Sequence, residues 1–92
     1  PTALRAVVAP GPPPAAVAVS WLPVSAARLA GYNLYRRAAG AAEWRRLNPA
    51  LLPTPVFRDS SVAAGDYEYA ATAVDEDGNE SPPSAPASIH VP

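Results

Sequence analysis

The sequence contains no cysteine, and this absence excludes two common ways of stabilising a small domain. Neither a disulfide framework nor a thiolate zinc site can form. The absence leaves the cellular compartment open. Stability must therefore come from the packing of side chains and from hydrogen bonds.

Residue types that carry catalysis are also scarce. The chain has no lysine, no Gly-x-Ser-x-Gly elbow and a single histidine, His90. Because His90 lies between Ile89 and Val91 in a short strand pattern, alternation turns it outward, without partners at metal-ligand or triad spacing. The sequence predicts no catalytic residue, no metal site, no cofactor and no enzymatic activity.

Long apolar runs and excess positive charge are missing as well. No run approaches the roughly 20 residues of a membrane span, so membrane insertion is not expected. Four arginines, Arg36, Arg37, Arg45 and Arg46, predict a basic hairpin, but the net charge of the chain is −1. Nucleic-acid binding usually brings net positive charge and stacking aromatic residues, so no nucleic-acid partner is expected. We interpret the hairpin as a solvated edge that resists aggregation.

The length and composition predict one small domain with a thin core. A chain of 92 residues rarely divides into two cores, so residues 1–92 are expected to form a single domain, cut from a longer multidomain protein. Hydrophobic residues make up 49% of the chain, and 21 of these residues are alanine. Each larger apolar side chain must therefore contribute strongly to the core.

Prolines and glycines divide the chain into segments too short for most helices. Within these segments apolar residues alternate with polar ones, as in half-buried strands. Three well-patterned strands are predicted at 15–21, 31–37 and 66–74, and weaker ones at 4–8, 43–47, 56–59 and 86–91. Seven strands predict an all-β, immunoglobulin-like sandwich of two antiparallel sheets, with a hairpin tip at residues 38–42.

The order of short motifs resembles a fibronectin type III domain, of the kind that serves as an accessory module in bacterial proteins. The motifs are "VAVSW" at 17–21, "LAGYNLYRR" at 29–37, "VFRD" at 56–59, "VAAGDYEYAATAVD" at 62–75 and "GNESPPS" at 78–84. Each is weak alone, but together they cover essentially the whole chain in the order and spacing of the family.

The resemblance implies structural roles for particular residues. Trp21 would fill the space between the sheets, and Tyr67 would form a tyrosine corner, with its hydroxyl bonded to the backbone near residues 62–64. The core expected from the pattern and the resemblance consists of Trp21, Tyr32, Leu34, Val62, Tyr67 and Tyr69.

Asp66 and Glu68, with Asp59 nearby in the sequence, could suggest acid–base chemistry of the glycosidase kind. Such a pair needs a deep cleft and one raised pKa, which a small closed sandwich does not favour. Since Arg37 and Glu68 are expected on neighbouring strands with the same orientation, we predict a cross-strand ion pair between them, worth about a few tenths of a kcal/mol.

Tyr35 and Trp44 admit two interpretations. They could form an exposed aromatic pair that stacks on sugar rings or contacts a protein, or they could pack across the edge of the sheet. The general preference for buried aromatic side chains favours packing. An exposed and adjacent arrangement would instead favour binding.

The stretch "AVDEDGNESPPS" at 73–84 contains four carboxylates and could suggest a calcium loop. Asp75, Asp77 and Asn79 fit the start of an EF-hand, but Glu80 replaces the required glycine and Pro86 replaces the final glutamate. Asn79-Glu80-Ser81 is a formal glycan acceptor, which has meaning only in a glycosylating host.

The better interpretation of this stretch is a turn. Asp77-Gly78 is a strong reversal signal, and Pro82 and Pro83 delay the return to strand pairing because they cannot donate to the ladder. The turn does not require the acidity of the loop. The candidate partner-contact residues are therefore Asp75, Glu76, Asp77, Asn79 and Glu80, together with Tyr35 and Trp44.

The resemblance implies a non-catalytic spacer or partner-contact module of a secreted or surface bacterial protein, such as a carbohydrate-active enzyme or a protease. The alternative is a dedicated protein- or polysaccharide-binding module, using the 75–80 loop or the Tyr35/Trp44 surface. The expected partners are flanking domains of the same chain, or a protein or polysaccharide. The expected location is extracellular, at the cell surface or periplasmic, and the isolated domain is expected to be a monomer.

Overall fold

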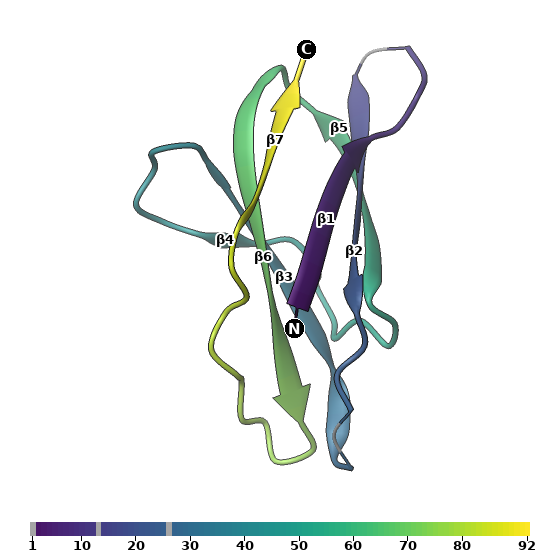
Figure 1. Cartoon of the computed structure of the whole chain (residues 1–92), viewed down its shortest axis with the longest axis vertical. Coiled ribbons are helices and arrows are strands. Elements are labelled where there is room, and N and C mark those ends of the chain that lie inside the picture. Colours follow the sequence, from purple (N-terminus) through teal and green to yellow (C-terminus); the bar gives the residue numbers. More distant parts are fainter. Residues whose placement is uncertain (1, 13, 26) are drawn as a thin grey trace.

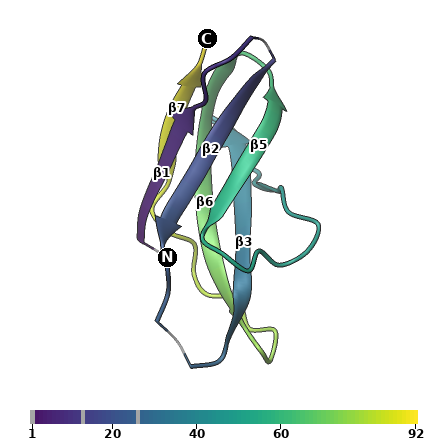
Figure 2. The same cartoon turned by 90° about the vertical axis from the view of Figure 1, so that its right-hand side faces the viewer.

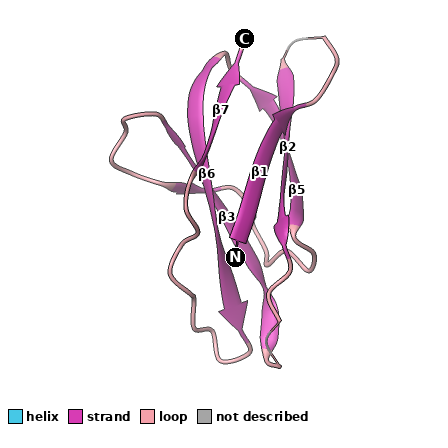
Figure 3. Cartoon of the chain, in the orientation of Figure 1, coloured by secondary structure: helices cyan, strands magenta, loops and turns pink. Residues whose placement is uncertain are grey.

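The computed structural model describes residues 2–12, 14–25 and 27–92, which form seven strands in two antiparallel sheets (Figure 1). One sheet has the order β1-β2-β5 and the other the order β4-β3-β6-β7. The strands are β1 (Thr2–Val8), β2 (Ala15–Leu22), β3 (Leu29–Ala38), β4 (Arg45–Arg46), β5 (Val56–Val62), β6 (Gly65–Asp75) and β7 (Ala87–Val91). The predicted all-β sandwich is confirmed (Figure 3). In the described part of the chain, no helix is long and apolar enough to cross a membrane.

The strand predicted at 43–47 is reduced to two residues, Arg45–Arg46. The chain turns back after β3, with Gly40 at a φ of 84°, and pairs only at Tyr35–Arg46 and Arg36–Arg45. Beyond Arg46 the N–H of Leu47 still donates to the carbonyl of Leu34 at 2.9 Å, but the N–H of Leu34 donates to the side chain of Asn48 at 2.8 Å, so regular backbone pairing stops there. The prediction was therefore wrong in length. β5 is longer than predicted, because it extends beyond the predicted 56–59 to Val62.

The core lies between the two sheets; in Figure 2 the β1-β2-β5 sheet lies in front of the larger sheet. Trp21 of β2 meets Tyr32 of β3 edge to face, with ring centroids 5.5 Å apart and planes at 75°. Tyr32 also ties down the β2–β3 connection, because its hydroxyl accepts the N–H of Val24 at 2.9 Å. Of the residues expected in the core, Trp21, Tyr32, Leu34, Val62 and Tyr69 are buried, and Tyr67 is half-buried against them.

A polar bridge joins the two sheets beside this core. Asp59 of β5 accepts hydrogen bonds from Arg36 of β3 at 2.6 Å and from Tyr69 of β6 at 2.7 Å. Asp59 is only 7% exposed, so its charge is held by two donors in a largely water-free place. Burial, and then the Asp59 carboxylate, raise the pKa of Tyr69 well above its ordinary value. The interpretation of Arg36 as part of a solvated hairpin was therefore wrong, because its guanidinium turns inward to Asp59.

The tyrosine corner joins β5 to β6. The hydroxyl of Tyr67 donates to the carbonyl of Ala63 at 2.8 Å, within the span that the resemblance implied. Gly65 begins β6 with a φ of 149°, and a Cβ there would lie 3.7 Å from the Tyr67 ring. The ring therefore covers a backbone conformation that favours glycine.

Asn48 is a buried polar residue that organises the segment after β4. Its Oδ1 accepts the N–H of Leu34 at 2.8 Å, and its Nδ2 donates to Asn33 Oδ1 at 2.8 Å and to the carbonyl of Ala50 at 2.9 Å. Only 2% of Asn48 is exposed. The side chain thus replaces backbone pairing at the point where the chain leaves the sheet.

Replacement of Tyr67 by Phe should lower the free energy of unfolding by about 1 kcal/mol, because the carbonyl of Ala63 loses its donor while the ring remains. Chemical denaturation of both proteins measures this difference. Equal denaturation midpoints would show that the corner contributes nothing to stability.

Replacement of Asn48 by Ala should cost about 2 kcal/mol or more, because the buried N–H of Leu34 loses its acceptor. Asn79→Ala is the matched control, since Asn79 is exposed and keeps its backbone bonds; its cost should stay below about 1 kcal/mol. Thermal unfolding of both variants compares the two sites. A cost for Asn48→Ala no larger than that of the control would contradict the role given to Asn48.

Candidate functional site

The structure divides the candidate residues between two places. Asp75, Glu76, Asp77 and Asn79 form the turn after β6, at the lower end of Figure 1. Glu80 leaves the turn and joins Tyr35 and Trp44 beside the outer face of the larger sheet. The sequence grouped Glu80 with the loop, so its position beside the aromatic pair was not foreseen.

Asp75 closes the turn through its carboxylate. Its Oδ1 accepts the N–H groups of Asp77 and Asn79, each at 2.9 Å, and its backbone carbonyl accepts the N–H of Gly78 at 3.0 Å. Gly78 has a φ of 83°, as predicted for the residue that reverses the chain. The N–H of Asn79 is the largest of the contacts that lower the pKa of the Asp75 carboxyl. The stretch at 75–79 is a side-chain-capped turn.

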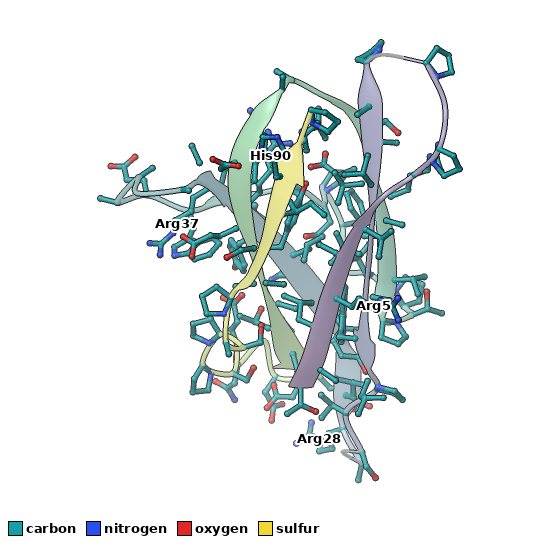
Figure 4. The ribbon with its side chains drawn as sticks, turned by 45° about the horizontal axis from the view of Figure 1, so that its top comes forward. Arg5, Arg28, Arg37 and His90 are labelled. Carbon is teal, nitrogen blue, oxygen red and sulfur yellow. The ribbon has the colours of Figure 1, made fainter. Side chains whose placement is uncertain are left out.

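Arg28 holds the tip of this turn from the β2–β3 connection. Its two terminal nitrogens donate to the two carboxylate oxygens of Asp77, at 2.8 and 2.9 Å, and its Nε lies 3.7 Å from Glu76 Oε2. Figure 4 shows Arg28 at the lower end of the molecule. Sequence reasoning missed this bidentate pair. One signal in the sequence could have predicted it. Arg28 comes just before β3 and Asp77 just after β6, and these two strand ends pair at Leu29 and Asp75.

Glu80 turns back onto the outer face of the larger sheet. The residue forms an isolated bridge with Val74, and its carboxylate reaches over β6 and β3. Its Oε2 accepts hydrogen bonds from Thr72 Oγ1 at 2.5 Å, from Asn33 Nδ2 at 3.2 Å and from the hydroxyl of Tyr35. Glu80 nevertheless remains exposed.

These hydrogen bonds shift two pKa values in opposite directions. The bond from Thr72, then that from Tyr35, lowers the pKa of Glu80 below its ordinary value of 4.5, against the effect of desolvation. Burial, followed by the bond to Glu80, raises the pKa of Tyr35. At neutral pH the site therefore contains an ionised carboxylate and a protonated phenol.

Trp44 completes the other side of the site. The guanidinium of Arg37 lies 4.3 Å from the centroid of the indole, a cation–π distance. Arg37 also donates to Glu68 at 2.9 Å, and the two residues are direct cross-strand partners. The predicted ion pair is confirmed, and it fixes the cation that covers Trp44.

The segment after Glu80 runs beside β6 without forming a regular strand, as its prolines predicted. Ser81 and Ser84 each make two hydrogen bonds to β6: the backbone N–H donates to a carbonyl, and the side-chain hydroxyl accepts an N–H. The partners are Ala73 and Ala71. Serine hydroxyls thus replace the ladder beside Pro82 and Pro83.

Tyr35, Trp44 and Glu80 line one groove of about 230 Å³. Its base consists of Tyr35, Ala70 and Thr72, on the paired strands β3 and β6, and Ser81 and Pro83 line its other side. Both aromatic side chains are half-buried. The pair is therefore adjacent and partly exposed, and it contributes to packing and to a surface groove.

His90 and Asp66 form an exposed pair on neighbouring strands. Nδ1 of His90 lies 2.6 Å from Oδ1 of Asp66 on the neighbouring strand, and both side chains are about 70% exposed (72% and 68%). Figure 4 shows His90 close to the upper end of the ribbon. Among the described residues, no group of three or more His, Asp or Glu side chains could hold a metal ion.

The contribution of Glu80 to stability should depend on pH. Because its pKa is lower in the folded state, the contribution is present above the unfolded value, near 4.5, and is lost as the pH falls through the lower folded pKa. Glu80→Gln cannot titrate, so the stability difference between the two proteins should shrink in this window. Urea denaturation at several pH values measures it. A difference that stays constant with pH would exclude the assigned ionisation.

No family model matches the sequence. Among solved structures, the chain is similar to a protein described as "a Fn3-like protein from Clostridium thermocellum". The TM-score is 0.77 at 23% sequence identity, and the match covers 97% of this chain and 88% of the other. The chain therefore has a fibronectin type III-like β-sandwich fold, which the sequence motifs had predicted.

Proposed function

We propose that this chain is a non-catalytic module of a secreted or surface multidomain bacterial protein, and that it holds the segments on either side of it at a fixed distance. One observation carries the proposal. β7 ends at the upper tip of the molecule, whereas β1 begins in its lower half (Figure 1). Segments attached at the two ends would therefore leave the domain at different heights along its 40 Å long axis.

The internal contacts support a stiff body. β3 and β6 are the two longest strands and pair with each other over most of their length. The Asp59 bridge then fastens this pair to β5 of the other sheet. Relative motion of the two sheets would break buried, charge-assisted hydrogen bonds, which makes bending within the domain costly.

The engagement of the charged groups supports the non-catalytic part of the proposal. Asp59 is held by Arg36, and Glu68 is held by Arg37. Asp75 caps a turn. A nucleophile, a base that activates it and a group that stabilises charge do not meet among the described residues.

A fusion protein with this domain between two reporter domains, each with one spin label, tests the spacer role. The chain has no cysteine, so cysteine labels attach only to the reporters. We expect a narrow distribution of label distances that does not change with salt. A Gly/Ser linker of equal length is the control, because it should spread broadly around an end-to-end distance of about 50 Å. A distribution as broad as that of the linker would contradict the proposal.

A second candidate function is a binding module. It is favoured by the observation that Tyr35, Trp44 and Glu80, which are distant in sequence, line the same groove. Both functions are compatible in one domain, because the groove lies on a sheet face and away from the two ends of the chain. The chemistry of the groove decides which ligand class it suits.

A further inference from the structure

The volume of the groove limits the size of the ligand that it can bind. Its volume of about 230 Å³ is smaller than the 300 to 1,000 Å³ that is typical of drug-sized ligands. One ring or one side chain of a larger molecule therefore fits. A ligand that extends beyond the groove would continue along the surface of the sheet.

The aromatic side chains favour a partner that packs against a ring. Tyr35 and Trp44 belong to rigid surroundings, because the Tyr35 hydroxyl is bonded to Glu80 and Trp44 is covered by Arg37 at 4.3 Å. Neither ring has to be ordered when a ligand binds, which reduces the entropic cost. Ligand groups that pack against aromatic rings include a cation, a proline-rich peptide and a sugar.

The positive charges beside the groove disfavour a cation. Arg37 already lies over one face of Trp44, and the charge of Arg46 acts on both Tyr35 and Glu80. A cationic side chain would therefore meet two guanidinium groups as well as the single carboxylate of Glu80. Like charges that are brought together without screening repel each other.

The hydrogen-bonding capacity of the groove separates a peptide from a sugar. All three bonds to the Glu80 carboxylate end on Oε2, so that, among the described residues, Oε1 remains available to accept a further bond. A carboxylate can only accept, and it therefore needs a ligand that donates. Proline has no N–H, and the hydroxyl of Tyr35, which could have donated to a peptide carbonyl, is already bonded to Glu80. A sugar ring presents several hydroxyl donors.

We propose that the Tyr35/Trp44 groove binds one sugar ring of a polysaccharide, with the ring against the aromatic side chains and a sugar hydroxyl donating to Oε1 of Glu80. The proposal deepens the second candidate function above and is independent of the spacer role. The fusion experiment reports only on domain rigidity, so either proposal can fail without the other.

NMR titration of the isotopically labelled chain with cellohexaose, xylohexaose and chitohexaose tests the proposal. The two indole N–H signals distinguish the sites, because Trp21 is buried in the core and Trp44 lines the groove. We expect at least one of these oligosaccharides to shift the Trp44 signal and the amides of Thr72 and Ser81 at millimolar concentration, while the Trp21 signal stays fixed.

Variants then separate the groove from non-specific binding. Trp44→Ala should weaken binding by at least about tenfold, as truncation of an aromatic anchor does. Glu80→Gln should weaken it several-fold, whereas Glu76→Gln, the matched change on the exposed turn, should leave it unchanged. Circular dichroism confirms that each variant is folded. Because Glu80→Gln keeps both aromatic rings, it tests the proposal even if Trp44→Ala does not fold.

Three results would overturn the proposal. The first is the absence of any shift with all three oligosaccharides at the solubility limit. The second is a shift that persists unchanged in Trp44→Ala or Glu80→Gln. The third is a response of the Trp44 signal to a hexaproline peptide or to arginine amide but to no oligosaccharide, which would assign the groove to one of the other ligand classes.

Discussion

The edge-to-face contact between Trp21 and Tyr32 is the interaction on which the rest of the structure depends. Alanine makes up a large share of the apolar residues, so few side chains are large enough to span the space between two sheets. Trp21 comes from one sheet and Tyr32 from the other, and their contact sets how closely the sheets approach. Because Tyr32 also accepts the N–H of Val24, the same ring positions the connection that leads to Arg28. Tyr32 thus positions both the core and the β2–β3 connection at one end of the domain.

Polar side chains supply hydrogen-bond partners at several places where backbone pairing stops. Asn48 takes over from β4, and Ser81 and Ser84 take over beside the prolines that precede β7. Asp75 does the same for the turn after β6. In each case a short side chain supplies the partner that a neighbouring strand would have given, which keeps backbone groups hydrogen-bonded at irregular places. These side-chain hydrogen bonds allow irregular segments to lie close to the sheet. One such segment, with Ser81 and Pro83, lines the groove together with Trp44.

Several charged side chains of the domain are engaged with one another. Arg28, Arg36 and Arg37 each pair with a carboxylate on a different element. This pairing weakens the interpretation of the acidic turn as a partner-contact surface, because the charge of Asp77 is met by Arg28 within the domain. The exposed carboxylate with the most unusual surroundings is Glu80, which three donors hold beside two aromatic rings. The residues that the structure brings together into a groove are therefore those on the face of the sheet, whereas the loop residues 75–79 stay a prediction.

The sequence by itself determined the elements and their order. Alternation of apolar residues, prolines between strands and Asp77-Gly78 report on local backbone geometry, which neighbouring residues control. The expected core followed from the same alternation together with the resemblance, and the pairing of Arg37 with Glu68 followed once the resemblance implied the strand order. The tertiary structure alone decided that Arg36 turns inward to Asp59, that Arg28 clasps Asp77 and that Glu80 reaches Tyr35. The partners of these contacts lie 23, 49 and 45 positions apart in the chain. Their meeting depends on strand register and on the path of irregular segments, which no local pattern specifies.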